Sequence, residues 1–383
     1  MPELVALELP AGEAFVDALR RVWDAGDAAF PLDPRLPPPA AADLLRAMAP
    51  GAVVGADGER RRLEAGRPIE PGDALVVATS GTTGEPKGVV LTHGAVAASA
   101  AATSARLAVD PVADRWLACL PLAHMGGLGV VTRALHSGTP LEVHERFEAG
   151  AVEEAARRGA TLVSLVPTVL GRVDAGLFRV VLVGGAAPPT TRPANVTATY
   201  GLTETGGGVV YDGTPLEGVE LRIGDGRLGA PGEVLVRAPM LLRGYRDGID
   251  PRLPGGWLPT GDGGALDDTG RLSVTGRLAE VIVTGGEKVW PVDVEAVLLG
   301  HHEVADVQVV GRPDPEWGQV VVARVVPRDL RRPPSLQELR AHVQARAAPW
   351  SAPRRLELVD ALARTPSGKL LRGPAGQRAE QSG

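Results

Sequence analysis

The chain has 383 residues, of which 44% are hydrophobic and 22% are charged, and its formal net charge is −6. This composition is typical of a globular protein, and the length is enough for two or three domains. The acidic balance argues against nonspecific binding to nucleic acid or anionic membranes. The single cysteine, Cys119, excludes an internal disulfide, and no apolar run reaches the length of a membrane span. No secretion signal is visible after Met1, so we expect a cytoplasmic protein.

Lysine is scarce in this chain. Of its 40 basic residues, only Lys87, Lys288 and Lys369 are lysines. The abundance of Ala, Gly and Pro indicates a GC-rich genome as the simplest cause. Lysine is nevertheless a flexible point charge, whereas arginine is a rigid planar fork. The three lysines therefore mark positions where arginine would not fit.

The first two hundred residues alternate between strand and helix patterns. Residues 1–72 are rich in Ala and Pro, and we expect a short lead-in that packs on the main domain. From residue 73 the alternation predicts a mostly parallel sheet that helices cover on both faces. The expected strands are 74–79, 116–120, 141–144, 162–166 and 180–183, and the expected helices are 13–24, 93–109, 126–136 and 151–158.

The pattern changes after Tyr200. Short strands at 219–223, 233–237 and 271–275 are separated by Gly, Asp and Pro turns, which predicts a small β-barrel-like subdomain. The remaining strands, 281–283, 307–310 and 320–326, and the helices 292–299 and 335–347 predict a small α+β unit. We therefore expect an α/β protein with an N-terminal domain over 1–277 and a C-terminal domain over 278–383.

The segment Thr79–Gly88 reads TSGTTGEPKG and directly follows a buried strand. Its four small hydroxyl residues and three glycines expose backbone N–H groups, and Lys87 adds a positive charge. Such a loop is suited to wrapping a polyphosphate. It is not a Walker A loop, because Gly88 rather than Ser or Thr follows the lysine. The order of these residues after a strand disfavours the alternative, a flexible surface loop.

This segment resembles the signature of the adenylate-forming superfamily, which contains acyl-CoA synthetases, luciferases and peptide-synthetase adenylation domains. Further segments match the motifs of that superfamily in the expected order, and the resemblance covers the chain from about residue 73 to its end. These segments are 200–205 (YGLTET), 232–237 with 244–245, 256–262, 276–277, 284–291 and 365–369. The resemblance implies that ATP activates a carboxylic acid as an acyl-adenylate, which a thiol then attacks.

The resemblance also implies roles for individual residues. Lys369 matches the catalytic lysine, Thr203 would bond the α-phosphate, and Glu204 would hold Mg²⁺, which prefers oxygen ligands. The implied ATP or AMP contacts are Thr79, Ser80, Gly81, Thr82, Thr83, Gly84, Lys87, Gly184, Gly185, Ala186, Tyr200, Gly201, Asp262 and Arg277. CoA would bind near Gly285, Gly286 and Lys288. Taken singly, Tyr200 has the alternative of a core aromatic, Glu204 that of a helix N-terminal charge and Asp262 that of a turn cap.

Members of the family rotate their C-terminal domain between the two half-reactions, so residues 278–383 would form a mobile lid. The hinge usually carries Asp or Lys, whereas this chain has Ala279 at the matching position. The two-domain plan is therefore expected, and the hinge residue departs from the family pattern.

The expected acid-binding residues are His124, Ser164, Thr168, Arg172 and Gly206. Amino-acid-activating relatives place an Asp just after the position of His124. This chain has Met125 and Gly126 there, which disfavours an amino acid as substrate. The alternative for His124 is a core histidine whose hydrogen bonds are satisfied.

Segments 164–172, 181–188 and 200–219 resemble the o-succinylbenzoate–CoA ligases of menaquinone biosynthesis, including short actinobacterial members in which most of the opening subdomain is missing. Their substrate is a dicarboxylate, so the carboxylate that does not react needs a cation or several donors. Arg172 is the candidate cation. Its alternative is a surface arginine on a short helix.

Three other functions stay open at this point. They are a ligase for another aryl or fatty acid, an enzyme that loads a carrier protein in secondary metabolism, and a non-catalytic adenylate-binding protein. The expected partners are a small carboxylic acid, ATP and CoA, with Mg²⁺ as the metal. A carrier protein and a homodimer are left open, and neither nucleic acid nor a membrane span is expected.

Overall fold

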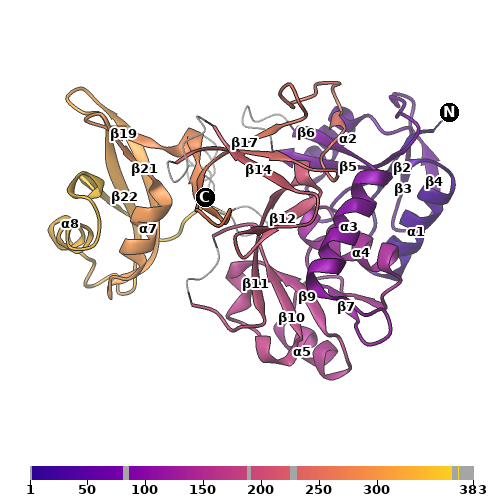
Figure 1. The fold of residues 1–383 in the computed structure, drawn as a ribbon, viewed down its shortest axis with the longest axis horizontal. Coiled ribbons are helices and arrows are strands. Elements are labelled where there is room, and N and C mark those ends of the chain that lie inside the picture. The colour runs from indigo at the N-terminus through magenta and orange to yellow at the C-terminus, as the bar shows by residue number, and fades with distance from the viewer. Residues whose placement is uncertain (1, 81–85, 188–190, 225–230, 365–369, 371–383) are drawn as a thin grey trace. The chain divides into compact units, whose positions relative to one another are not determined.

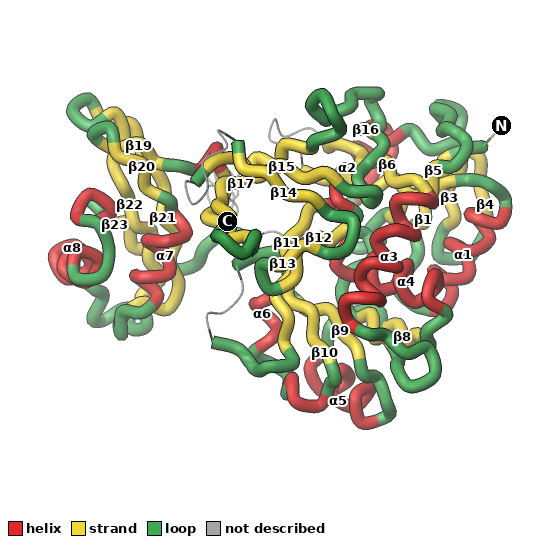
Figure 2. Tube along the Cα trace, in the orientation of Figure 1, coloured by secondary structure: helices red, strands yellow, loops and turns green. Residues whose placement is uncertain are grey.

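The structure is a computed structural model that describes residues 2–80, 86–187, 191–224, 231–364 and 370 (Figures 1 and 2). Its contacts divide the chain into two compact units. The first contains Met1–Leu221 and Val236–Leu258, and the second contains Arg222–Leu235 and Pro259–Gly383. The domain boundary expected after residue 277 stays a prediction.

The first unit contains a seven-stranded sheet in the order β16-β6-β5-β2-β1-β3-β4. Its strands are β1 (Leu4–Leu7), β2 (Ala28–Pro31), β3 (Ala52–Val54), β4 (Arg60–Arg62), β5 (Asp73–Ser80), β6 (Pro86–Thr92) and β16 (Gly244–Tyr245). Helices α1 (Glu13–Asp24) and α2 (Pro38–Met48) connect β1 to β2 and β2 to β3. The expectation that residues 1–72 form a lead-in is wrong. All four residues of β1 are buried, and β1 pairs with β2 and β3 as an internal strand.

A second seven-stranded sheet has the order β13-β12-β11-β10-β9-β7-β8. Its strands are β7 (Trp116–Ala118), β8 (Leu141–Val143), β9 (Leu162–Leu165), β10 (Val180–Val183), β11 (Val196–Leu202), β12 (Gly207–Tyr211) and β13 (Thr214–Pro215). Five neighbouring strands, β8, β7, β9, β10 and β11, run parallel, whereas β12 and β13 are antiparallel. Helices α5 (Ala149–Arg157) and α6 (Pro167–Leu170) lie in the connections of this sheet.

Helices α3 (His93–Leu107) and α4 (Met125–Ser137) pack against each other and link the two sheets (Figure 1). Helix α3 contacts β5 and β6 of the first sheet, and α4 contacts β7, β9 and β12 of the second. The hydroxyl of Thr92 caps α3 by accepting a hydrogen bond from the Ala95 N–H at 3.1 Å. Helix α3 is rich in Ala and helix α4 in Gly, and these small residues allow the two helices to approach each other closely.

The second unit contains most of a four-stranded sheet and a five-stranded sheet. The first is formed by β14 (Glu220–Ile223), β15 (Gly232–Arg237), β17 (Leu258–Leu266) and β18 (Leu272–Arg277). The second is formed by β19 (Ile282–Thr284), β20 (Glu287–Val289), β21 (Val304–Asp314), β22 (Gly318–Pro327) and β23 (Arg355–Leu358). Helices α7 (Pro291–Leu299) and α8 (Leu336–Gln344) contribute Val294, Leu298, Leu339 and Val343 to its core. Within the described ranges, no helix is long and apolar enough to cross a membrane.

Cys119 lies in the core of the second sheet, where only 1% of its surface is exposed. Burial raises the pKa of its thiol to about 12. Because the thiolate is the reactive form, we expect negligible reaction of the native protein with a disulfide reagent at pH 8. One thiol should react per chain in denaturant. Rapid reaction of the native protein would contradict this packing.

Strand β11 bulges at Tyr200 and Gly201, where it pairs with β12. A Cβ atom at Gly201 would lie 1.9 Å from the carbonyl oxygen of Gly207, so no side chain fits there. We predict that Gly201→Ala lowers the free energy of unfolding by about 1–3 kcal/mol in urea titrations. The matched control is Gly150→Ala in α5, where nothing lies within 4 Å of the added methyl. It should leave stability unchanged or raise it by up to about 1 kcal/mol. Equal effects of the two substitutions would contradict the close approach.

Candidate active site

The expected substrate residues of the first unit follow the carboxyl ends of parallel strands. His124 follows β7, Thr168 follows β9, Gly184 follows β10 and Thr203 follows β11. Since these strands are neighbours in one sheet, their carboxyl ends meet at the same edge. That edge is where open α/β sheets bind ligands. The sheet thus brings together residues that are up to 80 positions apart in the sequence.

The segment expected to bind polyphosphate begins at the end of β5 and ends in β6, two strands that pair antiparallel as a hairpin. Thr79 pairs with Lys87 across the two strands, and the Thr79 hydroxyl donates to the Lys87 carbonyl oxygen at 3.4 Å. Ser80 pairs with Pro86. Gly81, Thr82, Thr83 and Gly84 lie outside the described residues. Because β5 is the first strand of this hairpin, the segment directly follows a buried strand.

Gly184, Tyr200 and Gly201 lie on adjoining segments of the second sheet. A Cβ atom at Gly184 would approach the Thr199 hydroxyl within 2.4 Å, which explains the glycine. Gly185 has φ +84° and is exposed together with Ala186. Tyr200 is half-buried. The expected adenine-binding residues are therefore accessible and lie next to each other across β10 and β11.

Glu204 and Lys87 both contact Tyr245, a residue that the sequence motifs contain but to which we assigned no role. The Tyr245 hydroxyl donates to the Glu204 carboxylate at 3.0 Å. The Lys87 ammonium lies 4.9 Å from the centre of the Tyr245 ring, in a cation–π contact. Burial, followed by the charge of Glu204, raises the pKa of Tyr245, so its hydroxyl remains a donor at neutral pH.

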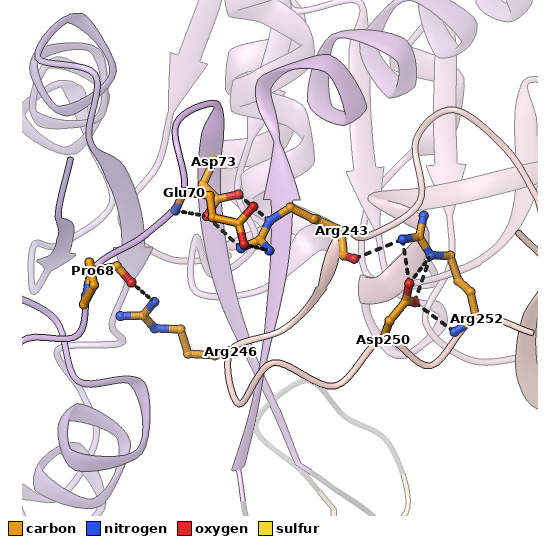
Figure 3. Close-up of polar contacts among 7 residues, drawn as sticks. All are labelled: Pro68, Glu70, Asp73, Arg243, Arg246, Asp250 and Arg252. Carbon is orange, nitrogen blue, oxygen red and sulfur yellow. Dashed lines mark hydrogen bonds and ion pairs between the residues drawn. The ribbon is translucent and has the colours of Figure 1, made fainter. Parts of the chain in front are cut away.

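Two arginines beside β16 hold that strand in place (Figure 3). The Arg243 guanidinium donates to both oxygens of Asp73, at 2.8 and 3.0 Å, and also to Glu70. The Arg246 guanidinium donates to backbone carbonyls, including those of Met48 at 3.0 Å and Pro68 at 2.6 Å. Burial lowers the pKa of Arg246 to about 10, so the group stays charged at neutral pH.

The expected acid-binding residues differ in their surroundings. Ser164 is buried in β9, Gly206 is buried with φ +63°, and Thr168 is exposed on α6. His124 is exposed at the N-terminal end of α4, so the alternative of a buried core histidine is wrong. The Ser99 hydroxyl donates to the Gly206 carbonyl at 3.2 Å and holds this turn against α3.

Arg133 and Arg172 differ sharply as partners for a second carboxylate. Arg172 is exposed, and its guanidinium lies over the Phe147 ring at 5.1 Å. Arg133 on α4 is only 5% exposed, and within the described part of the chain its Nε has no hydrogen-bond partner. A Cβ atom at Gly207 would lie 3.5 Å from an Arg133 terminal nitrogen. Arg133 was not among the expected site residues, although it is the only charged residue in helix 125–137 besides histidine.

Asp262 and Arg277 lie in the second unit, on paired positions of β17 and β18. Their side chains form an ion pair with a nitrogen–oxygen distance of 3.1 Å, and Asp262 is 6% exposed. Arg277 also donates to the Thr260 carbonyl at 2.9 Å. The structure thus brings together these two expected nucleotide contacts.

Gly285 and Gly286 form the turn between β19 and β20, with φ values of +58° and +86°. The Gly285 N–H donates to the Trp317 carbonyl at 2.9 Å, and a Cβ atom at Gly285 would lie 2.8 Å from the Trp317 ring. Lys288 is exposed on β20. The expected CoA-binding residues therefore share one hairpin, with the two glycines in its turn and Lys288 on β20. Lys369 lies outside the described residues.

Comparisons with known proteins find two matching family profiles. The profile of the AMP-binding enzyme family matches residues 2–246, and that of the AMP-binding enzyme C-terminal domain matches 293–369. A probable 2-succinylbenzoate–CoA ligase of Mycobacterium tuberculosis is 37% identical over 401 residues, covering 97% of this chain and 98% of the relative. A 2-succinylbenzoate–CoA ligase of Geobacillus kaustophilus is 37% identical over 338 residues, covering 78% and 68%.

Solved structures give the same result. The o-succinylbenzoate CoA synthetase of Bacillus subtilis with its acyl-adenylate intermediate matches with a TM-score of 0.86 and 29% identity, covering 97% of this chain and 88% of that one. The amide bond synthetase of Marinactinospora thermotolerans matches with a TM-score of 0.83 and 28% identity, covering 98% and 89%. The fold alone therefore does not fix the acceptor that attacks the adenylate.

These findings confirm the expected α/β fold and the expected class of enzyme, an AMP-forming acid–CoA ligase that uses ATP, Mg²⁺ and CoA. The alternative of a non-catalytic adenylate-binding protein is disfavoured by relatives that are ligases over their whole length. The chain belongs to the AMP-binding enzyme family.

Proposed function

We propose that this protein is a 2-succinylbenzoate–CoA ligase of menaquinone biosynthesis. Its similarity to the Mycobacterium tuberculosis ligase extends over nearly the whole of both chains. The observation that carries the proposal is Arg133, a buried arginine whose Nε has no hydrogen-bond partner among the described residues and whose terminal nitrogen would lie 3.5 Å from a Cβ atom at Gly207. The guanidinium lies 5.8 Å from the centre of the Trp116 ring, which leaves its buried Nε–H without a hydrogen bond to any described residue. An unsatisfied buried donor of a charged group is costly, and a substrate carboxylate would remove that cost.

The nucleotide side of the proposed site would act mainly by positioning and charge neutralisation. Lys87 and the hairpin tip would hold the phosphates, Thr203 would donate to the α-phosphate, and Tyr200 would pack on adenine. Asp262, with Arg277 beside it, would accept hydrogen bonds from the ribose. The Lys369 ammonium would bridge the reacting carboxylate and phosphate oxygens.

Glu204 fits the expected role of magnesium ligand. It is half-buried, and its carboxylate already accepts a hydrogen bond from Tyr245. The described residues contain no group of three or more His, Cys, Asp or Glu placed to hold a metal. Mg²⁺ would therefore take most of its oxygen ligands from ATP and water. When bound, the ion would offset the negative charge that builds up on the phosphates.

Residues of the second unit would take part in the second half-reaction. Gly285 and Gly286 form an exposed turn with no side chains, which would let the narrow pantetheine arm of CoA pass close to the backbone. A carrier-protein acceptor, a homodimer and a cytoplasmic location stay predictions. The domain boundary near residue 277 is likewise proposed rather than tested.

The proposal is tested by incubating the protein with ATP, Mg²⁺, CoA and o-succinylbenzoate and identifying the thioester by mass spectrometry. We expect o-succinylbenzoyl-CoA, AMP and pyrophosphate. Benzoate, a medium-chain fatty acid and an acyl carrier protein serve as alternative acid or acceptor. Faster turnover with any of these than with o-succinylbenzoate and CoA would contradict the substrate assignment.

Arg133 and Arg172 give different predictions for recognition of the acid. Loss of a hydrogen bond to a charged group costs about 1.5–3 kcal/mol, so Arg133→Met should raise the KM for o-succinylbenzoate about 10- to 100-fold. The KM for ATP should stay within about twofold of the wild-type value. Arg172→Met is the comparison, and we expect less than a threefold change because that side chain is exposed. The reverse order of effects would restore Arg172 as the carboxylate partner.

The scarcity of lysine allows a direct test of the phosphate site. Amine-directed labelling should modify mainly Lys87, Lys288, Lys369 and the N-terminus. ATP with Mg²⁺ should protect Lys87, because its ammonium would then face phosphate oxygens. Peptide mass spectrometry measures the labelled fraction, with exposed Lys288 as the internal reference in the absence of CoA. Equal labelling of Lys87 with and without ATP would remove this lysine from the nucleotide site.

A further inference from the structure

Strand β16 connects two parts of the first unit that are far apart in the sequence. It pairs antiparallel with β6, so that Tyr245 lies opposite Val89, two residues beyond Lys87. Just before β16, the Leu242 N–H donates to the Glu204 carbonyl at 2.8 Å. One short segment therefore has backbone hydrogen bonds to both the phosphate-binding strand and the turn that carries Glu204.

The Tyr245 side chain makes the same connection through its polar and aromatic groups. Its hydroxyl donates to the Glu204 carboxylate at 3.0 Å, and its ring lies 4.9 Å from the Lys87 ammonium. A hydrogen bond to a carboxylate fixes the direction of that group, and a cation–π contact favours the ammonium over the ring face. The two contacts use different parts of one side chain, so substitution can separate them.

Side-chain and backbone hydrogen bonds anchor β16, and this anchoring fixes the position from which Tyr245 contacts Glu204 and Lys87. Arg243 pairs with Asp73, which is only 1% exposed, and Arg246 donates to the Pro68 carbonyl (Figure 3). Arg246 also donates to the Met48 carbonyl. The Arg246 N–H donates to the Gly88 carbonyl at 2.7 Å. A Cβ atom at Gly88 would lie 2.8 Å from the Arg246 Cβ, which explains the last glycine of the phosphate-binding segment.

We propose that Tyr245 is a positioning residue that sets the distance between the phosphate-binding lysine and the magnesium-binding carboxylate before ATP arrives. Its hydroxyl orients the Glu204 carboxylate toward the metal, and its ring holds the Lys87 ammonium toward the phosphates. The inference rests on the proposed function, because that proposal places Lys87 and Glu204 at the nucleotide. It adds a residue that contacts both groups and orders them in the absence of ligand.

Two substitutions separate the contacts. Tyr245→Phe removes the hydroxyl and keeps the ring, whereas Tyr245→Leu removes both. ATP binding is measured by titration calorimetry at a series of Mg²⁺ concentrations, with no acid present. We expect Tyr245→Phe to raise the half-saturating Mg²⁺ concentration roughly tenfold and to leave the Kd for ATP at saturating Mg²⁺ within about twofold. Tyr245→Leu should also weaken ATP binding at saturating Mg²⁺, by roughly three- to tenfold.

The matched control is Tyr211→Phe, which deletes another hydroxyl in the same unit. The buried Tyr211 hydroxyl lies 3.2 Å from the Thr103 hydroxyl, and neither residue belongs to the proposed site. Tyr211→Phe should keep the wild-type Mg²⁺ dependence even where urea unfolding shows lower stability. A merely structural Tyr245 would lower stability without changing the Mg²⁺ dependence.

A wild-type Mg²⁺ dependence in Tyr245→Phe would overturn the inference. A Tyr211→Phe variant whose half-saturating Mg²⁺ concentration rises as much as that of Tyr245→Phe would overturn it as well. Identical Mg²⁺ and ATP profiles for Tyr245→Phe and Tyr245→Leu would overturn the role of the ring. If Tyr245→Leu does not fold, the comparison of Tyr245→Phe with Tyr211→Phe decides the role of the hydroxyl. Failure of the wild-type protein to bind ATP would instead refute the proposed function, so the two failures are distinguishable.

Discussion

The pairing of β16 with β6 is the interaction on which the arrangement of the first unit's proposed nucleotide residues depends. Lys87 and Glu204 are far apart in the sequence, and a third distant segment, 242–246, connects them through its backbone hydrogen bonds. The ion pair of Arg243 with the buried Asp73 holds this segment, and loss of the arginine would leave the buried carboxylate without its charged partner. A weaker connection would leave both charged side chains free to reorient in water, and ATP binding would then have to order them.

The second sheet supplies the other constraint. Parallel strands place the residues that follow them at one edge, so His124, Thr168, Gly184 and Thr203 share a surface without sequence proximity. Glycines then remove side chains where two backbones approach, as at Gly201 against Gly207. Arg133 enters this region from the buried side of α4. Its terminal nitrogen would lie 3.5 Å from a Cβ atom at Gly207, where a substrate carboxylate would supply the hydrogen bond that the buried Nε lacks among the described residues.

Much of the architecture could be predicted from the sequence, because apolar strands and Ala-rich helices alternate clearly after residue 73. Within residues 1–72 the helix 13–24 was predicted correctly, whereas the strands were missed, because short Ala and Pro segments obscured β1 and β3. The prediction also missed β17, since the glycines of 258–266 resemble turn residues. In the structure they allow close packing: a Cβ atom at Gly264 would lie 2.7 Å from the Ser273 carbonyl.

The candidate site was predictable where a motif names the residue, and less so where tertiary packing decides. Arg133 lies on α4 and is buried, whereas Arg172 lies in the turn after α6 and is exposed, and no short sequence pattern shows this difference in burial. Tyr245 was visible as part of a Gly-Tyr motif, but its contacts with Glu204 and Lys87 join three distant segments. Short-range sequence patterns carry no information about such contacts.

The central claim is that the protein activates o-succinylbenzoate as an acyl-adenylate before any thiol takes part. Exchange of labelled pyrophosphate into ATP measures that step alone, because reversal of adenylation returns label to ATP without CoA. We predict exchange that requires o-succinylbenzoate and Mg²⁺ and proceeds in the complete absence of CoA. Thioester formation without any such exchange, or exchange that is faster with benzoate than with o-succinylbenzoate, would contradict the account.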